Sequence, residues 1–264
     1  MRWWEEHEFE LGQTMSWSFG SLTLTITRLK KEWQVAFNHF AINSQDEFMN
    51  VVFEPAVQSL LGDFKREAKF FRFAFKETEP TLKMTLHLPD RPLVARPIRP
   101  LMISGREMAT LYTSAALWLG LAVGAENKKL MEVPTREYSD TWFGPNTTIG
   151  ELCYASKTNA YLQSEELTKR AHRAVIPVTI HNENNESLKI ERINIPVHFL
   201  NLYQAFDDHF YGENLLLVRH SSSNTVKIDI EKKSELHRTH RLITASRKKK
   251  DDNFIFKTIE MLFA

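Results

Sequence analysis

The strongest constraint on the fold is an alternation of apolar and polar residues with a period of two. Leu22, Leu24 and Ile26 alternate with threonines, so one face of this segment is apolar and the other carries hydroxyl groups. A β-strand places successive side chains on opposite faces, whereas a helix would distribute these residues around its axis. A second alternating run begins at Trp33, and residues 22–40 are therefore predicted to form a β-hairpin whose three aliphatic residues face a core.

The same pattern recurs along the chain. Phenylalanines alternate with other residues from Phe71 to Phe75, and Leu82, Met84, Leu86 and Leu88 do so in the next run. Residues 70–88 are accordingly predicted to form a second hairpin, with Phe73 and Leu86 facing the core. Further strands are expected at residues 175–181 and in a hairpin that pairs residues 215–218 with 226–230. The polar run at 182–186 is predicted to be a turn.

Two segments depart from strand periodicity. Residues 55–69 are predicted to form a helix, because Pro55 suits a first helical position and the apolar residues that follow have a spacing of three to four. Residues 89–100 hold four prolines. That density excludes a helix and a central strand, so an edge strand or a connector is expected there.

The uncharged segment 108–125 is long enough to approach a membrane span. Hydroxyl groups and two glycines dilute its hydrophobicity, which favours two adjoining buried strands with a bend near residues 114–116. The fold is therefore predicted to be all-β, with a few short helices, as one or two antiparallel β-sandwich units. The expected divisions are residues 1–100, a core at 101–235 and a basic C-terminal segment at 236–264; a single domain is the alternative.

Composition limits the classes of function. The 264 residues are 42% hydrophobic, which is ample for a folded core, and 34 basic against 33 acidic residues leave a net charge of +1. This balance makes a nucleic-acid partner unlikely for the protein as a whole. Cys153 is the one cysteine, so no internal disulfide is possible, and the acidic N-terminus lacks the pattern of a secretory signal. A cytoplasmic location is expected.

The segment 139–154 is the best candidate binding site. It gathers Asp140, Trp142, Glu151 and Tyr154 around two glycines. One interpretation is a recognition loop in which the indole is a platform for a partner and the carboxylate of Asp140 anchors it. The structural alternative is that Trp142 plugs the end of a sandwich while the glycines satisfy turn geometry.

Evidence for catalysis is weak. Cys153 needs a nearby histidine to act as a nucleophile, and His172, His181 and His198 are candidates without local support. His237 and His240 are close in sequence, yet no third metal ligand accompanies them. Phosphate-loop, dinucleotide-binding and nucleophile-elbow motifs are absent. We therefore predict no catalytic residues, no metal and no cofactor.

Basic residues are concentrated in segment 237–250. The candidate anion-binding residues are Arg241, Arg247, Lys248, Lys249 and Lys250. Such a run must be solvated, and its simplest role is a strand edge or loop whose cations discourage pairing. Its functional interpretation is a patch for phosphate groups on a nucleic acid or an anionic membrane.

Several motifs resemble a known family. They are the segments 100–101, 110–112, 117–118, 132–135, 139–144, 150–155 and 190–197, together with Gly105. They resemble an uncharacterised prokaryotic family, domain of unknown function four hundred and thirty-two, over residues 80–230. The resemblance implies no activity and no active-site residues. The resemblance also implies that genes of this family can lie near genes of small mechanosensitive channels. A membrane-associated protein is therefore a candidate partner.

Three functions remain open from the sequence. The leading hypothesis is a non-enzymatic cytoplasmic β-sandwich module that binds another protein, because sandwich loops are common binding sites and no catalytic cluster is present. The first alternative is a hydrolytic or carbohydrate-active enzyme that uses Asp140 and Glu151. The second is an anion or nucleic-acid binder that acts through residues 237–250.

Overall fold

The computed structural model describes residues 3–40, 52–56, 68–144, 148–159, 161–221, 225–231, 236–249 and 255–258. Contacts between residues divide the chain into two compact units. Unit 1 comprises Met1–His87 and Leu117–Glu137, and unit 2 comprises Leu88–Ala116 and Tyr138–Ala264. The units thus interleave along the chain, whereas the division predicted from the sequence is linear.

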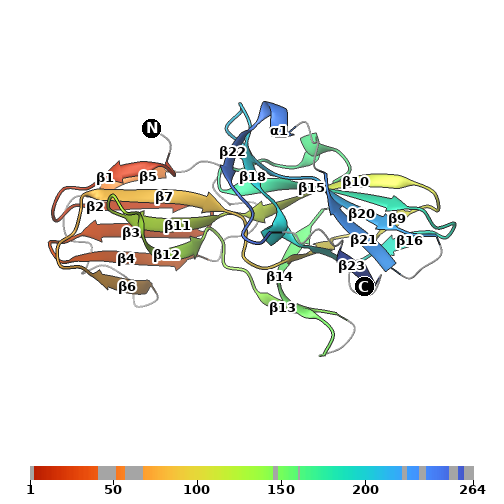
Figure 1. Cartoon of the computed structure of the whole chain (residues 1–264), viewed down its shortest axis with the longest axis horizontal. Helices are drawn as coiled ribbons and strands as arrows, with labels where there is room; N and C mark the ends of the chain where they lie inside the picture. Colours follow the sequence, from red (N-terminus) through yellow and green to blue (C-terminus); the bar gives the residue numbers. More distant parts are fainter. Residues whose placement is uncertain are drawn as a thin grey trace. The chain divides into compact units, whose positions relative to one another are not determined.

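Unit 1 contains two antiparallel sheets (Figure 1). The first, in spatial order, consists of β5 (Val52–Ala56), β2 (Thr14–Phe19), β3 (Leu22–Arg28), β4 (Glu32–His39) and β6 (Lys69–Ala74). The second consists of β1 (Glu6–Glu8), β7 (Thr81–His87), β11 (Trp118–Val123) and β12 (Lys128–Pro134). The all-β prediction is confirmed, since strands account for nearly all regular structure in the described residues.

The first predicted hairpin is confirmed. Strands β3 and β4 pair antiparallel, with Leu24 opposite Phe37 and Ile26 opposite Val35. The three aliphatic residues of β3, at positions 22, 24 and 26, are buried, and so is Trp33 of β4. Their alternation with threonines therefore reflects the burial of one face of the strand.

The second predicted hairpin is wrong in its pairing. Its strands exist, but β6 pairs with β4, while β7 pairs with β1 and β11 in the other sheet. Leu86 is buried as expected, whereas Phe73 is only partly buried. The ring of Phe71 stacks on Phe37 of its own sheet, at 5.9 Å between centroids. Alternation identifies a strand but not its neighbour, and here residues 75–80 carry the chain from one sheet to the other.

The helix predicted at residues 55–69 is wrong at both of its ends, where the structure has strands. Pro55 belongs to edge strand β5 and Lys69 to β6, while residues 57–67 lie outside the described residues. Proline has no backbone N–H, and an edge strand tolerates it because one side of that strand forms no hydrogen bonds to a neighbouring strand. Segment 108–125 does form two strands, β10 (Met108–Ala116) and β11, which meet at Leu117. Among the described residues, no helix is long and apolar enough to cross a membrane.

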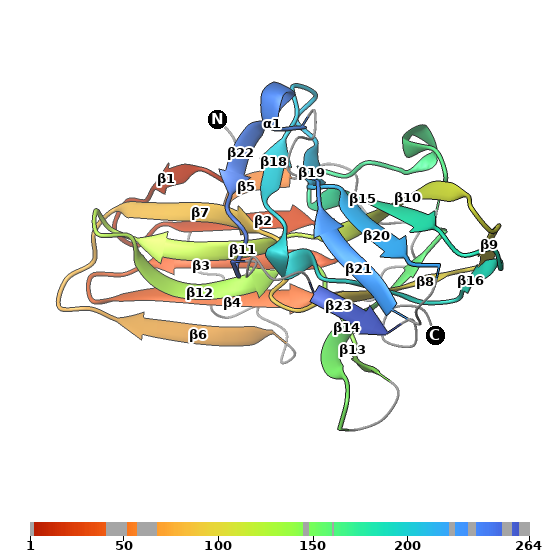
Figure 2. The ribbon, with the colours of Figure 1, turned by 45° about the vertical axis from the view of Figure 1, so that its right-hand side comes forward.

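Unit 2 is organised around β15 (Arg173–Asn182), the central strand of a mixed sheet (Figure 2). Strand β10 pairs antiparallel with β15 over its whole length. The other edge of β15 pairs in parallel first with β19 (Phe210–Gly212) and then with β20 (Leu215–Arg219). The same sheet contains β18 (Leu202–Gln204), β21 (Thr225–Ile230), β22 (Arg241–Thr244) and β23 (Ile255–Thr258). The predicted strand at 175–181 and the hairpin of β20 with β21 are confirmed.

A smaller sheet of unit 2 corrects the prediction for the proline-rich segment. Strand β8 (Leu93–Pro97) lies between β14 (Glu151–Thr158), which is parallel to it, and β17 (Ile193–Ile195), which is antiparallel. It is therefore a central strand. The prolines leave this possible because Pro92 precedes the strand and Pro97 ends it, so the residues between them keep their N–H groups. Strands β9 (Leu101–Ile103) and β16 (Leu188–Ile190) pair separately, and α1 (Leu236–Thr239) is a single turn.

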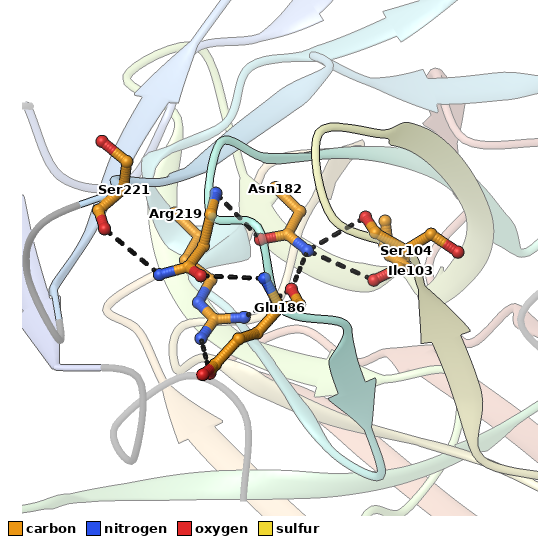
Figure 3. A network of polar contacts seen from close by, with 7 residues as sticks. Ile103, Ser104, Asn182, Glu186, Arg219 and Ser221 are labelled. Atoms are coloured by element: carbon orange, nitrogen blue, oxygen red, sulfur yellow. Dashed lines mark hydrogen bonds and ion pairs between the residues drawn. The ribbon is translucent and has the colours of Figure 1, made fainter.

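The predicted turn at 182–186 is the centre of a polar network (Figure 3). The side chain of Asn182 is fully buried, and its amide group donates to the carbonyls of Ile103 (3.2 Å), Ser104 (3.0 Å) and Glu186 (2.8 Å). Its oxygen accepts from the backbone N–H of Asn184 at 3.3 Å. One side chain thus hydrogen-bonds to the backbone of two loops.

Two more contacts join a third loop to this network. Asn184 donates from its side chain to the carbonyl of Ser221 at 3.3 Å, and Arg219 donates to the carbonyl of Glu186 at 3.4 Å. Figure 3 shows these side chains converging from β15, β20 and the turns that follow them. Hydrogen bonds from asparagine side chains therefore connect the loops at this end of the mixed sheet in unit 2.

Replacing Asn182 should destabilise the protein strongly. In Asn182→Ala three backbone carbonyls lose the donor that a fully buried side chain supplies, and we expect the free energy of unfolding to fall by about 2–3 kcal/mol. Asn185→Ala is the matched control, because this neighbouring side chain is exposed and accepts a single bond from Arg106. Its cost should stay below about 1 kcal/mol. Urea unfolding measures both, and equal costs would contradict the central role of Asn182.

Two histidines of unit 1 should make stability depend on pH. Burial lowers the pKa of His7 and of His39 below the ordinary 6.5. A hydrogen bond opposes this shift in each case, because the ring of His7 donates to the carbonyl of Trp3 and the ring of His39 donates to the carbonyl of Pro134. The unfolded chain therefore binds these protons more tightly. Stability should be greatest above 6.5 and fall as the pH drops through that value toward the folded-state pKa.

The test compares the wild type with a His7→Gln/His39→Gln variant, whose amides can donate but do not titrate. Urea midpoints are measured at about pH 7.5 and about pH 5.5, a window that spans the titration of an unfolded histidine. The wild type should lose more stability than the variant between these values. An identical loss in both proteins would show that other groups govern the dependence.

Candidate functional site

The predicted recognition loop is a β-hairpin of unit 2. Strand β13 (Asp140–Phe143) pairs antiparallel with β14, with Asp140 opposite Tyr154 and Trp142 opposite Leu152. Both views show this hairpin projecting from the sheets of unit 2 (Figures 1 and 2). Strand β14 continues into the smaller sheet beside β8, so the hairpin is anchored at its base.

Alternation divides the side chains of the hairpin between two faces. Residues directly opposite one another share a face. Asp140, Trp142, Leu152 and Tyr154 therefore lie on one face, and Thr141, Phe143, Glu151 and Cys153 lie on the other. The structure thus brings together three of the four predicted binding residues, whereas Glu151 points to the opposite side.

The second face anchors the hairpin. Phe143 and Cys153 are buried in a cluster with Val94 of β8. The guanidinium of Arg192 lies 5.2 Å from the centroid of the Phe143 ring, in a cation–π contact. Glu151 accepts a hydrogen bond of 2.7 Å from the side chain of Asn194, which is itself buried. The carboxylate of Glu151 is therefore engaged in holding β14 to β17.

The first face carries a charged and aromatic cluster at its base. The hydroxyl of Tyr154 donates to Asp90 at 2.9 Å, and Tyr138 stacks on its ring at 5.4 Å. Arg91 lies 5.2 Å from the same ring and 3.2 Å from a carboxylate oxygen of Asp140. Burial, followed by the hydrogen bond to Asp90, raises the pKa of Tyr154 well above its ordinary range. Its phenol therefore stays neutral at physiological pH and serves as a hydrogen-bond donor.

Three apolar side chains of the described residues toward the tip of the hairpin are exposed. Trp142 is 45% exposed, Leu152 43% and Ile149 52%. The indole lies against Gly150, where a Cβ atom would fall 2.6 Å from its ring nitrogen, so this glycine is required for the packing of Trp142. The neighbouring side chain of Phe143, by contrast, is 1% exposed.

Cys153 and the histidines are the side chains that could act as a nucleophile or as soft metal ligands. The thiol of Cys153 is buried, and its Sγ lies 3.5 Å from the carbonyl of Glu151. His181 and His220 both face the carboxylate of Glu183, at 3.9 Å and 3.0 Å. Across the described part of the chain, no group of three such side chains has the geometry of a metal site. The side chain of His237 lies outside the described residues.

The basic segment is a sheet edge along part of its length. Strand β22 pairs with β18, which places Arg241 opposite Gln204 with its side chain exposed. Arg247 donates from Nε to the carbonyl of Leu88 at 2.6 Å. The backbone N–H of Lys248 donates to the carbonyl of His198 at 3.1 Å, and the side chains of Lys248 and Lys249 are exposed. Lys250 lies outside the described residues.

Sequence reasoning missed four residues of the hairpin surface. Asp90 and Arg91 lie in the proline-rich segment and reach the site only through the pairing of β8 with β14. Leu152 could have been found by pairing the two strands around the glycines, since it is then opposite Trp142. Ile149, in the connection of the hairpin, has no comparable signal.

Comparison with known proteins identifies a family and nothing closer. No curated protein and no solved structure matches the chain. A family model matches residues 3–262, which is nearly the whole chain. The protein therefore belongs to the family described as "Protein of unknown function (DUF432)".

Proposed function

We propose that this protein is a non-enzymatic β-sandwich module of the cytoplasm that binds another protein through the β13–β14 hairpin. The observation that carries the proposal is the exposed apolar tip formed by Trp142, Ile149 and Leu152. Large aromatic side chains that are held in place at a surface often supply most of the energy of an interface. A membrane-associated protein is one candidate partner.

The surroundings of the tip support this role. Arg91 and Asp140 form an ion pair beside the apolar residues, and Tyr154 is held rigidly at the base by Asp90. An apolar centre with a polar rim is the usual composition of a protein interface. The buried face of the hairpin, through Phe143, fixes the position of the exposed face.

The two alternative functions have less support. An enzyme that uses Asp140 and Glu151 on one substrate needs both carboxylates at one place, and they lie on opposite faces of the hairpin. An anion binder at 237–250 would draw on Arg247, whose guanidinium is already bonded to the carbonyl of Leu88. Binding there would fall steeply with added salt, which makes it simple to detect.

A site-specific photocrosslinker at Leu152 tests the proposal in the cells that produce the protein. We expect a crosslinked species of defined mass, which mass spectrometry can identify, and a loss of at least about tenfold in its yield in Trp142→Ala. The control places the crosslinker at Lys157, an exposed residue of the same strand with its side chain on the opposite face. Equal adducts from both positions, or none from Leu152, would refute the proposal.

Stability measurements separate binding from folding. Trp142→Ala should lower the free energy of unfolding by less than about 1 kcal/mol, because the side chain is half exposed. Phe143→Ala, the adjacent buried position, should cost about 3–5 kcal/mol. If Trp142→Ala were as costly as Phe143→Ala, the plug interpretation would be correct and the loss of crosslinking would reflect unfolding.

A further inference from the structure

Two cations oppose each other across strands β8 and β14. Arg96 of β8 is directly opposite Lys157 of β14 in the parallel ladder, so both side chains lie on the same face of the smaller sheet of unit 2. Both are exposed, and neither forms an ion pair or a side-chain hydrogen bond within the described part of the chain. Like charges at opposed positions of neighbouring strands destabilise a sheet. This pair therefore weakens the association of β8 with β14.

Two further arginines extend the positive charge around the C-terminal end of β8. Arg192 directly precedes β17, which runs antiparallel to β8 and therefore begins beside the end of β8. Its guanidinium lies over the ring of Phe143, as described above. Arg99 follows β8 by two residues, is exposed, and forms no ion pair or side-chain hydrogen bond with any residue that the structure describes.

The nearby acidic side chains are engaged elsewhere. Glu151, the acid on the same face of β14, lies six residues from Lys157, which corresponds to about 20 Å along a strand. Its carboxylate accepts the hydrogen bond from Asn194. Glu191 forms an ion pair of 2.6 Å with Lys189. The charges of the exposed cations at the end of β8 are therefore available to an anion from outside the chain.

An exposed aliphatic side chain lies beside these cations. Ile98, two residues after Arg96, is 69% exposed, and its N–H donates to the carbonyl of Thr158 at 2.9 Å, so this segment continues along β14. Pro97 and Pro100 fix their φ angles on either side and restrict the backbone that presents the isoleucine. An aliphatic side chain next to unpaired cations matches the boundary between lipid headgroups and acyl chains.

We propose that Arg96, Ile98, Arg99 and Lys157 form a docking site for a bilayer that contains anionic phospholipids. The three cations bind headgroup phosphates, which relieves the repulsion between the opposed pair, and the isoleucine enters the boundary of the acyl chains. The site lies on the face of β14 opposite to Leu152, so it goes beyond the proposed function and does not depend on it.

Other anionic partners fit these residues less well. Proteins that bind single-stranded nucleic acid stack the bases on aromatic rings, whereas the exposed apolar residue here is aliphatic. Lysine is depleted at protein interfaces, and Lys157 is one of the opposed cations. A bilayer uses both features, because its phosphates meet lysine and arginine alike and its interior accepts an aliphatic group.

Sedimentation of the full chain with vesicles tests the site. Wild type should bind vesicles of phosphatidylcholine mixed with phosphatidylglycerol, should not bind phosphatidylcholine alone, and should dissociate as salt is added. Arg96→Gln/Lys157→Gln should lower the partition coefficient by about tenfold or more. Lys30→Gln/Lys31→Gln is the matched control, because it removes the same charge from two exposed residues between β3 and β4. Its binding should equal that of wild type.

Two further measurements separate docking from folding and detect insertion. Arg96→Gln/Lys157→Gln should keep or raise the urea midpoint, since it removes a repulsion between strands. Ile98→Ser keeps the cations and should lower the partition coefficient by about threefold or more. An environment-sensitive fluorophore on Ile98→Cys should shift to the blue with the mixed vesicles, whereas the same label on Lys31→Cys should not. Native Cys153 is buried and should stay unlabelled.

The results that would overturn the proposal are distinct. They include no binding of wild type to the mixed vesicles, and equal binding by wild type and Arg96→Gln/Lys157→Gln. A single-stranded oligonucleotide that binds in place of vesicles, and that Ile98→Ser binds as well as wild type does, would assign the cations to nucleic acid. Each of these results leaves the protein-binding role of the hairpin to the photocrosslinker at Leu152.

Discussion

Hydrogen bonding on both edges of β15 is the constraint on which unit 2 depends. One edge is occupied by β10 over its whole length, and the other is shared by β19 and β20. One face of this strand is apolar, and its residues Ile176, Val178 and Ile180 are all fully buried. Polar groups of the loops need partners where the strand ends, and its last residue, the buried Asn182, donates hydrogen bonds to those loops.

The hairpin of β13 and β14 uses the same alternation for two purposes. Phe143 and Cys153 bury one face against β8, and this fixes the strand in space. The opposite face is then presented with Trp142 and Leu152 exposed and with the charged cluster of Tyr154 at its base. Because the anchors and the exposed residues are adjacent in sequence but opposite in direction, a rigid support holds an apolar surface in contact with solvent.

Strand positions could be predicted from the sequence much better than strand neighbours. Alternation located β3, β4, β6 and β7 because burial of one face leaves a local pattern. The pairing of β6 with β4 depends on contacts such as that of Phe71 with Phe37, which are distant in sequence and leave none. Proline was also a misleading guide, because Pro97 ends a central strand where an edge strand or connector was predicted.

The sequence indicated several residues of the candidate site, but not which face of the hairpin each side chain occupies. Asp140, Trp142 and Tyr154 share a face only because the segment is a hairpin in a particular register, and a shift of one residue would have exchanged Trp142 for Phe143. That register is fixed by the burial of Phe143, since exposing this ring would cost far more than exposing the indole beside Gly150. Stability therefore depends on one aromatic residue of the strand and leaves the other available for binding. The exposed residues Trp142, Leu152 and Ile149 can therefore be replaced at a smaller cost to stability than Phe143.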